Sequence, residues 1–535
     1  MNQDLTLTEF PPVTTAEWEE AIRKDLRDAG PGPKIFYRAE DAAPGRFPYV
    51  LGARNANEWR IREVVRDADA ARAVLDAGAE EIRFVVGDPS IEQSLEQVLD
   101  SLPLDRCAVH FDAGDRAEEV LEAVLRRPLA RGSVDYEPLS NFDLAAKLVA
   151  QSRAMADFRV ITIRAHRFSD AGSTIAQELG LALAEGVEMM AQLTDRGVTP
   201  AQAAGALAFS FGIGSNYFGE IAKLRAARML WARALESFQP GLAQSIEMSI
   251  YARTSHWTAT VYDPHVNLLR ATTEAMAASI GGADAIEVEP FDSTYREPGE
   301  SSRRLARNTQ IILKQEAWLN RVVDPASGSY YLEVLTDSLA REAWKLLQQV
   351  EAGGGFLKYS ATGALERDIA KARADREADV STRRCSIVGT NQYPNPAERA
   401  LPRIERDDPA PRAASAFEQI RLRTERHAAR TGHTTRLLLL EAGDLKLRKA
   451  RSAFAANLFG CAGFEVQTSD TLMGDPDAIV LCSSDAEYAT LVPQVIQELR
   501  ASGKSTPVIA AGNLTDSSNA VEVLRAWQER LGIKD

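Results

Sequence analysis

The sequence has few of the residues that hold metals or disulfides. Its 535 residues include four cysteines, and no two of them form a CxxC pair. None of the six histidines occurs in an HxxxH or HExxH pattern, the spacings that place two histidines on one helix face for zinc. We therefore expect no zinc site, and the scattered cysteines predict free thiols in a reducing compartment.

Long apolar runs and basic blocks are also missing. No stretch approaches the roughly 18 apolar residues that a membrane-spanning helix needs. The first residues, MNQDLTLTEF, contain no basic region followed by an apolar run, so we expect no secretory signal. There are 62 basic and 76 acidic residues, a net charge of −14, and no basic block indicates nucleic-acid binding. These absences predict a cytoplasmic protein with no membrane or nucleic-acid partner.

What is present is a chain with 45% hydrophobic residues, enough for a large core and more than one domain. Its most informative stretch is FSFGIGSNYFGEIAKLRAARMLWARALESF, residues 209–238. A short strand over 206–211 leads through a glycine turn into a long helix that Ser215 or Asn216 can cap. Such junctions hold ligands in α/β proteins, although glycines alone more often make only a tight turn. Arg228 falls on the apolar face of this helix, so its charge needs a partner or the edge of the core.

Strands and helices alternate from about residue 63 to residue 355. Repeated βα units favour a parallel sheet with helices outside it, and seven or so units suit a (β/α)₈ TIM barrel. An open doubly wound sheet remains an alternative. We predict a barrel domain over residues 61–393, preceded by an N-terminal arm at residues 1–60. The predicted strands are 82–87, 107–112, 132–136, 158–163, 206–211, 247–251 and 285–288, with a last short strand at 387–389.

The remainder of the chain predicts a second α/β domain. Residues 394–434 are rich in Pro, Arg, Glu and Ala, which is typical of an interdomain linker, here passing into a polar helix. Residues 435–535 contain short apolar runs between helical segments, a pattern that suits a flavodoxin-like doubly wound sheet. The predicted strands of this domain are 436–440, 464–467, 478–482 and 508–511.

Five stretches resemble the methylmalonyl-CoA mutase family and occur in the same order as in that family. They are residues 209–238, 252–257 (ARTSHW), 302–313 (SRRLARNTQIIL), 321–331 (RVVDPASGSYY) and 350–355 (VEAGGG). The resemblance covers nearly the whole chain and implies a TIM barrel followed by a flavodoxin-like domain of the cobalamin-binding type. In this family the chemistry is a radical rearrangement of an acyl-CoA, which adenosylcobalamin initiates.

The cobalamin signature of the family is Asp-x-His-x-x-Gly, in which the histidine ligates cobalt. The matching positions here are Lys446, Arg448 and Arg451. A protonated arginine has no lone pair for cobalt, and a side chain at the glycine position hinders close approach of the loop. The comparison therefore implies a degenerate domain that binds no cofactor. These basic residues could instead bind an anion, but a solvated helix face is the simpler interpretation.

The catalytic positions of the barrel are also altered. The family's two tyrosines correspond to Val64 and His166, and its histidine corresponds to Arg167. His166 is one position from that histidine, so on an extended strand its side chain should point to the opposite side. We therefore expect no catalytic residue. Arg164, Arg167 and Arg228 are possible anion contacts, with salt bridges as the simpler alternative.

The resemblance implies a small (β), non-catalytic subunit of a heterodimeric mutase. Its partner would be a large (α) catalytic subunit of the same fold, which binds adenosylcobalamin and interconverts methylmalonyl-CoA and succinyl-CoA in propionate metabolism. Pairing of similar chains about a pseudo-twofold axis is a common outcome of duplication. Two alternatives remain open: an active acyl-CoA mutase with atypical site residues, and a stand-alone regulatory protein that binds CoA or another anion.

Overall fold

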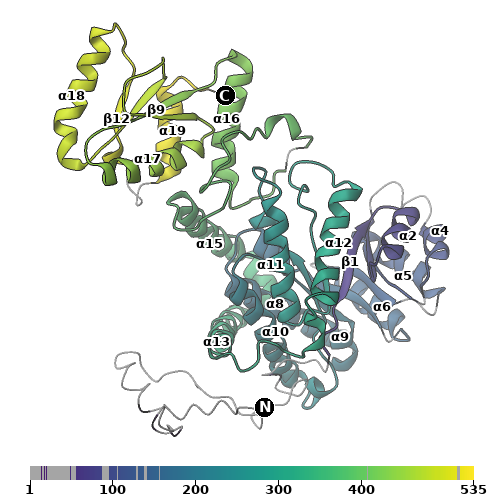
Figure 1. Ribbon diagram of the computed structural model, residues 1–535. Helices are drawn as coiled ribbons and strands as arrows, with labels where there is room; N and C mark the ends of the chain where they lie inside the picture. The colour runs from purple at the N-terminus through teal and green to yellow at the C-terminus, as the bar shows by residue number, and fades with distance from the viewer. Residues whose placement is uncertain are drawn as a thin grey trace, which may run out of the picture.

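The structure, a computed structural model, places most of the chain in two α/β units joined by a helix (Figure 1). It describes residues 56–86, 95–104, 106–127, 131–137, 141–155, 157–406, 408–514 and 519–534, together with residues 14, 17, 20 and 49. The predicted arm at residues 1–60 therefore lies almost entirely outside the described residues.

Eight parallel strands close into a barrel in chain order, which confirms the predicted TIM barrel. Each strand pairs with the next one in the sequence, and β8 pairs with β1. The sequence analysis missed β1, because its six residues, RIREVV, include three charged ones and do not form an apolar run. The strands are β1 (Arg60–Val65), β2 (Glu81–Val85), β3 (Ala108–Asp112), β4 (Arg131–Tyr136), β5 (Phe158–Ile163), β6 (Leu207–Ile213), β7 (Ile250–Thr254) and β8 (Ala285–Glu287).

Helices surround this barrel and continue beyond its last strand (Figure 1). Those between the strands are α2 (Ala68–Asp76), α4 (Leu95–Ser101), α5 (Ala117–Leu125), α6 (Phe142–Ser152), α7 (His166–Asp170), α8 (Ile175–Asp195), α9 (Pro200–Ala206), α10 (Tyr217–Phe238) and α11 (Val266–Ile280). After β8 come α12 (Glu300–Gln315), α13 (Tyr330–Ala352), α14 (Phe356–Ala361) and α15 (Ala364–Ser381).

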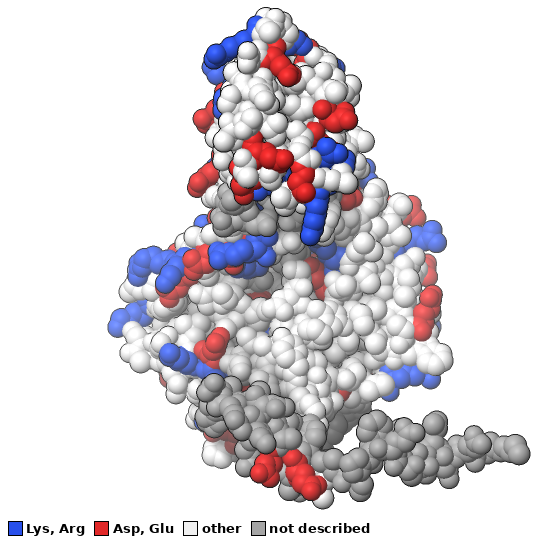
Figure 2. Space-filling model, turned by 60° about the vertical axis from the view of Figure 1, so that its left-hand side comes forward, with Lys and Arg blue, Asp and Glu red and all other residues white. Residues whose placement is uncertain are grey.

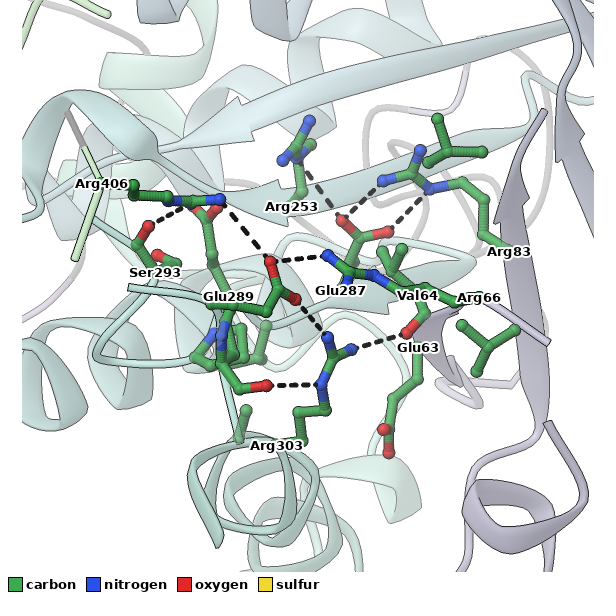
Figure 3. A pocket seen from close by; sticks show the side chains of 17 residues that line it. Glu63, Val64, Arg66, Arg83, Arg253, Glu287, Glu289, Ser293, Arg303 and Arg406 are labelled. Carbon is green, nitrogen blue, oxygen red and sulfur yellow. Dashed lines mark hydrogen bonds and ion pairs between the residues drawn. The ribbon is translucent and has the colours of Figure 1, made fainter. Parts of the chain in front are cut away.

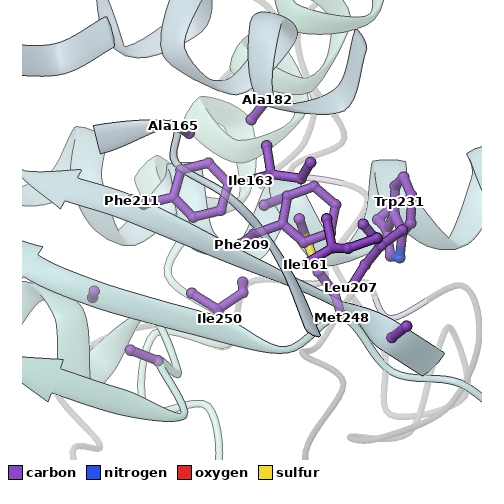
Figure 4. Packing of buried hydrophobic residues seen from close by; sticks show 14 of the residues in the cluster. Ile161, Ile163, Ala165, Ala182, Leu207, Phe209, Phe211, Trp231, Met248 and Ile250 are labelled. Carbon is purple, nitrogen blue, oxygen red and sulfur yellow. The ribbon is translucent and has the colours of Figure 1, made fainter. Parts of the chain in front are cut away.

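The unit formed by β6 and α10 lies deep in the core. Asn216 caps α10 by accepting a hydrogen bond from the Gly219 N–H at 3.2 Å, as its position after the glycine turn predicts. Phe209 from β6 packs edge to face against Trp231 from α10, with ring centroids 4.8 Å apart (Figure 4). Both rings are fully buried, so this contact contributes both apolar burial and favourable ring geometry. The buried Arg228 finds its required partner outside this cluster, in an aspartate of the loop before β8.

The C-terminal domain is a four-stranded parallel sheet in the order β10-β9-β11-β12. This order is that of a flavodoxin-like doubly wound sheet. Its strands are β9 (Arg436–Glu441), β10 (Glu465–Ser469), β11 (Ala478–Cys482) and β12 (Val508–Ala510), and its helices are α17 (Leu445–Gly460), α18 (Asp485–Ala501) and α19 (Ala520–Arg530). Figure 2 shows acidic and basic side chains interspersed on one face of this domain and of the barrel below it.

Helix α16 (Ser415–Thr431) joins the two units. Its buried Glu418 accepts a hydrogen bond from the Val261 N–H of the barrel at 2.6 Å, and Gln528 of α19 donates to its Ile420 carbonyl at 2.6 Å. Helix α16, which lies within the predicted linker, is therefore packed against both units.

The predicted strand at 387–389 does not form. Its only sheet-like pairing is a single bridge between Val388 and Gln392. The intervening Gly389 has a φ of +84°, so the chain reverses direction before a strand can extend. Within the described residues, no helix combines the length and apolar character needed to cross a membrane.

Candidate functional site

Charged side chains fill the interior of the barrel, beginning at its amino end. Arg62 of β1 donates to Glu81 of β2 from Nε and Nη2, at 2.9 and 2.7 Å. The Nε2 of His110 lies 3.1 Å from the same carboxylate. The chain of contacts continues from His110 Nδ1 to Ser133 Oγ at 2.8 Å and from that hydroxyl to Asp135 at 2.5 Å. All five residues are buried, so one polar network crosses strands β1 to β4.

A second network lies nearer the carboxyl end of the strands. Arg83 of β2 makes two hydrogen bonds, each 3.0 Å long, to Glu287 of β8. The hydroxyl of Tyr251 donates to the same carboxylate. Burial alone would raise the pKa of Glu287, but the charges of Arg83 and Arg253 outweigh it and hold that pKa well below its usual range. The Arg62 guanidinium lies 4.1 Å from the centroid of the Tyr251 ring, which connects the two networks.

These networks separate two cavities. The cavity at the carboxyl end has a volume of about 390 Å³ and is lined by residues such as Val64, Arg83 and Glu287 (Figure 3). The cavity at the amino end has a volume of about 300 Å³ and is lined by residues such as Arg62 and Tyr251. The two cavities share no lining residue. Among the described residues, the two cavities therefore lie on opposite sides of the charged networks.

Two of the predicted catalytic positions lie near this interior. Val64 lines the cavity at the carboxyl end, and its carbonyl accepts a hydrogen bond from Arg303 at 2.9 Å. His166 opens the short helix α7, so the expectation that it lies on an extended strand is wrong: β5 ends at Ile163 and the chain has already turned. Its Nδ1 lies 2.7 Å from the Ser210 hydroxyl. Burial, together with the nearby charge of Arg253, holds its pKa well below the usual value, so the ring is neutral.

The three candidate anion contacts already have carboxylate partners. Arg164 pairs with Asp112, Arg167 pairs with the buried Glu185 at 2.8 Å, and Arg228 pairs with an aspartate, Asp284, at 3.0 Å. Burial raises the pKa of Glu185 to about 8 even though Arg167 opposes the shift, so Glu185 is largely protonated at neutral pH, and Glu137, which also pairs with Arg167, supplies the negative charge. These arginines therefore balance acidic groups of their own chain.

In the C-terminal domain, side chains fill the carboxyl edge of the sheet. Arg451 of α17 donates to the Tyr488 hydroxyl at 3.1 Å and pairs with Asp485 at 2.9 Å. The same hydroxyl accepts hydrogen bonds from the backbone N–H groups of Ser483 and Gly512, both at 3.1 Å. A Cβ on Gly512 would lie 2.3 Å from the Arg451 guanidinium. The backbone N–H groups of Ser483 and Gly512 at this edge are thus already hydrogen-bonded to a side chain of the same chain.

The other two predicted cobalamin positions lie in the first turn of α17. Asp444 caps this helix by accepting a hydrogen bond from the Leu447 N–H at 2.9 Å. Lys446 is exposed and Arg448 is half-buried. Across the part of the chain that the structure describes, no group of three or more His, Cys, Asp or Glu side chains could hold a metal ion.

Sequence reasoning missed the residues that fill the barrel. The signal was present in β2, whose sequence EIRFV was interpreted only as a buried strand. Alternate residues of a strand point to the same side, so Glu81 and Arg83 share a face. The alternation of charged and apolar residues in β1 and β2 indicates a polar barrel interior.

The fold and site define a class of protein: an α/β barrel with a doubly wound α/β domain attached, in which buried ion pairs fill the barrel axis. Comparison with known families matches residues 119–455 to the family described as "Methylmalonyl-CoA mutase". The "Methylmalonyl-CoA mutase small subunit" of Porphyromonas gingivalis is 36% identical, and the alignment covers 98% of each chain. That of Streptomyces virginiae is 32% identical with the same coverage. The chain belongs to the methylmalonyl-CoA mutase family.

A large-subunit relative is more distant. The "Methylmalonyl-CoA mutase large subunit" of Streptomyces virginiae is 28% identical over 83% of this chain and 60% of its own length.

The family uses adenosylcobalamin, and the residues of this C-terminal domain do not fit that cofactor. Arg448 has no lone pair for cobalt, and Arg451 with Tyr488 fills the sheet edge that a corrin would have to approach.

Proposed function

We propose that this chain is the small, non-catalytic subunit of a heterodimeric, adenosylcobalamin-dependent methylmalonyl-CoA mutase. The large subunit would bind the cofactor and interconvert methylmalonyl-CoA and succinyl-CoA, in the cytoplasm and in propionate metabolism. This chain would contribute assembly and stability to the complex. The names of two relatives that match it end to end support the assignment to the small subunit. The proposed domains are an N-terminal arm (1–60), a barrel (61–393), a linker (394–434) and a degenerate cobalamin-type domain (435–535).

The observation that carries this proposal is the set of ion pairs across the barrel axis. An acyl-CoA threaded through the barrel would have to displace the pairs Arg62–Glu81 and Arg83–Glu287. Separating a buried pair leaves uncompensated charges at a cost of about 3–5 kcal/mol each. These pairs therefore disfavour binding of an acyl-CoA along the barrel axis and hence catalysis, but they link neighbouring strands into a stable scaffold.

The C-terminal domain supports the same assignment. The alternative of an active mutase with atypical residues needs a cobalt ligand, but arginine stands at that position. It also needs a side chain that can take the place of the family's tyrosine in the barrel, where Val64 offers only an aliphatic group.

The test compares the purified chain alone with the chain co-expressed with a large subunit from the same organism. We expect the isolated chain to retain no cobalamin after dialysis, as judged by its absorption spectrum. The co-expressed complex should retain one cobalamin per heterodimer and show mutase activity. Stoichiometric cobalamin on the isolated chain would contradict the proposal, as would failure of the two chains to co-purify.

A matched pair of variants assigns the cofactor to one subunit. Replacing Arg448 by Ala in this chain should leave the cobalamin content and kcat of the complex unchanged. Replacing the histidine of the large subunit's Asp-x-His-x-x-Gly motif should remove both. Loss of cobalamin on changing Arg448 would instead show that this domain takes part in cofactor binding.

A further inference from the structure

Several arginines line the cavity at the carboxyl end of the barrel (Figure 3), and an exposed glutamate, Glu297, lies among them. Glu297, in the loop between β8 and α12, lies 2.6 Å from Arg66, 2.9 Å from Arg303 and 3.7 Å from Arg406. Its side chain is 42% exposed, so it can leave this position without exposing a buried group. One carboxylate cannot balance the charges of both Arg303 and Arg406.

The other carboxylates that face the cavity have cations of their own. Each lies within ion-pair distance of a basic side chain, whose attraction offsets the cost of removing the carboxylate from water. These pairs are Glu63 with Arg307 at 2.6 Å, Glu287 with Arg83 at 3.0 Å, and Glu289 with His256 at 3.6 Å, although His256 lies closer to Asp408, at 2.7 Å. Hydrogen bonds to Asp408 and Glu289 overcome the opposing effect of burial and raise the pKa of His256 to about 10, so this ring is charged.

Arg253 adds a further positive charge. It extends from the end of β7 to the cavity (Figure 3), and its ion pair with Glu287 is long, at 3.7 Å. That carboxylate already accepts two hydrogen bonds from Arg83 and one from Tyr251. The guanidinium of Arg253 therefore shares Glu287 with Arg83, and the charge of Glu289, which also acts on Arg253, is shared with His256.

Helix α12 strengthens the positive potential. It is 16 residues long and begins beside the cavity, where Pro298 and Arg303 form part of the lining. Gly299 precedes it and offers no side chain to cap its first N–H groups. A helix N-terminus carries a partial positive charge, which adds to that of the arginines.

We propose that this cavity binds a small, multiply charged anion through Arg253, Arg303 and Arg406, and that Glu297 takes the place of the anion in its absence. The volume of about 390 Å³ suits a small metabolite. Guanidinium groups that approach from β7, α12 and the segment before α16 can each contact a different oxygen of a phosphate or dicarboxylate. None of the three arginines stands at a position where the family resemblance places a catalytic residue, although one such position, Val64, also lines the cavity.

The test is isothermal titration calorimetry on the full-length chain at low ionic strength, with inorganic pyrophosphate and with malonate as separate probes. We expect binding that weakens with added salt. Arg253→Gln and Arg406→Gln should each weaken it about tenfold or more, the usual effect of losing a hydrogen bond between charged groups. Glu297→Gln should tighten binding, because it removes the internal competitor.

The control is Arg341→Gln, which removes the same charge from an exposed pair on α13 and should leave binding unchanged. Melting curves by circular dichroism identify variants that fail to fold, and tighter binding by Glu297→Gln cannot arise from misfolding. Binding of pyrophosphate would identify the ligand of the cavity as a phosphate compound, and binding of malonate alone would identify it as a dicarboxylate. The proposal is overturned if neither probe binds, if Glu297→Gln does not tighten binding, or if Arg253→Gln behaves like the control.

Discussion

Replacing Glu287 by Gln should destabilise the barrel strongly, because this carboxylate is the shared counterion of the barrel interior. It is 5% exposed and accepts two hydrogen bonds from Arg83, each 3.0 Å long, and another from Tyr251. Glutamine would leave the Arg83 guanidinium buried without a negative charge. Breaking a buried ion pair from one side costs about 3–5 kcal/mol, and we expect a loss in that range at neutral pH.

The pH dependence of this loss has a defined sign. Burial would raise the pKa of Glu287, but Arg83 and Arg253 hold it below its unfolded value, which is about 4.3. A group with a depressed folded pKa contributes stability above its unfolded pKa, and this contribution is lost as the pH falls through the folded value. The difference between the wild type and the variant should therefore be large near pH 7 and shrink in acid.

The assay is urea unfolding followed by tryptophan fluorescence, with Asp337→Asn as the control. Asp337 pairs with Arg341 at 2.8 Å on the exposed face of α13, and such pairs contribute about 0–1 kcal/mol. The double replacement of Arg83 and Glu287 by Met should recover part of the stability, because the buried Arg83 charge is removed together with its partner; recovery stays partial because Arg253 still loses its pair with Glu287. A shift for Glu287→Gln no larger than that of the control would refute the conclusion that these ion pairs are buried.

Three further changes test other parts of the structure. Gly512→Ala should destabilise the C-terminal domain by about 1–3 kcal/mol, because its Cβ would lie 2.6 Å from a ring carbon of Tyr488 as well as 2.3 Å from the Arg451 guanidinium, so both side chains would have to move; in the same urea titration Gly205→Ala, with nothing within 4 Å, should be neutral or stabilising. Phe209→Ala should cost about 3–5 kcal/mol, since its buried ring packs 4.8 Å from that of Trp231; an unchanged urea midpoint would contradict this packing. Burial raises the pKa of Glu274 to about 8, so its contribution to stability is present below its unfolded pKa and lost as the pH rises through about 8. Glu274→Gln should therefore reduce the fall in melting temperature between about pH 4.3 and pH 8, and an identical fall in both proteins would contradict the burial of this carboxyl.

Local sequence pattern was enough for most of the elements. The apolar run over 158–163 predicted β5 at its observed bounds, because a strand covered by helices on one side needs few polar residues there. The glycine turn and the repeating apolar face of residues 217–238 likewise predicted α10. The same criterion failed for β1, whose inward residues are charged, and for His166, where the chain turns into α7 directly after β5.

The sequence by itself determined the family, and it predicts the replacement of that family's chemical groups, because residue identity at positions such as Val64 and Arg448 is a local property. Only the tertiary structure decided which charges neutralise one another. Arg83 and Glu287 are 204 residues apart in the chain and 3.0 Å apart in space. Barrel closure brings β1 and β8 side by side, and the energy of an ion pair depends on spatial distance and burial rather than on sequence separation. The filled axis and the arginines around Glu297 therefore became visible only in the folded chain.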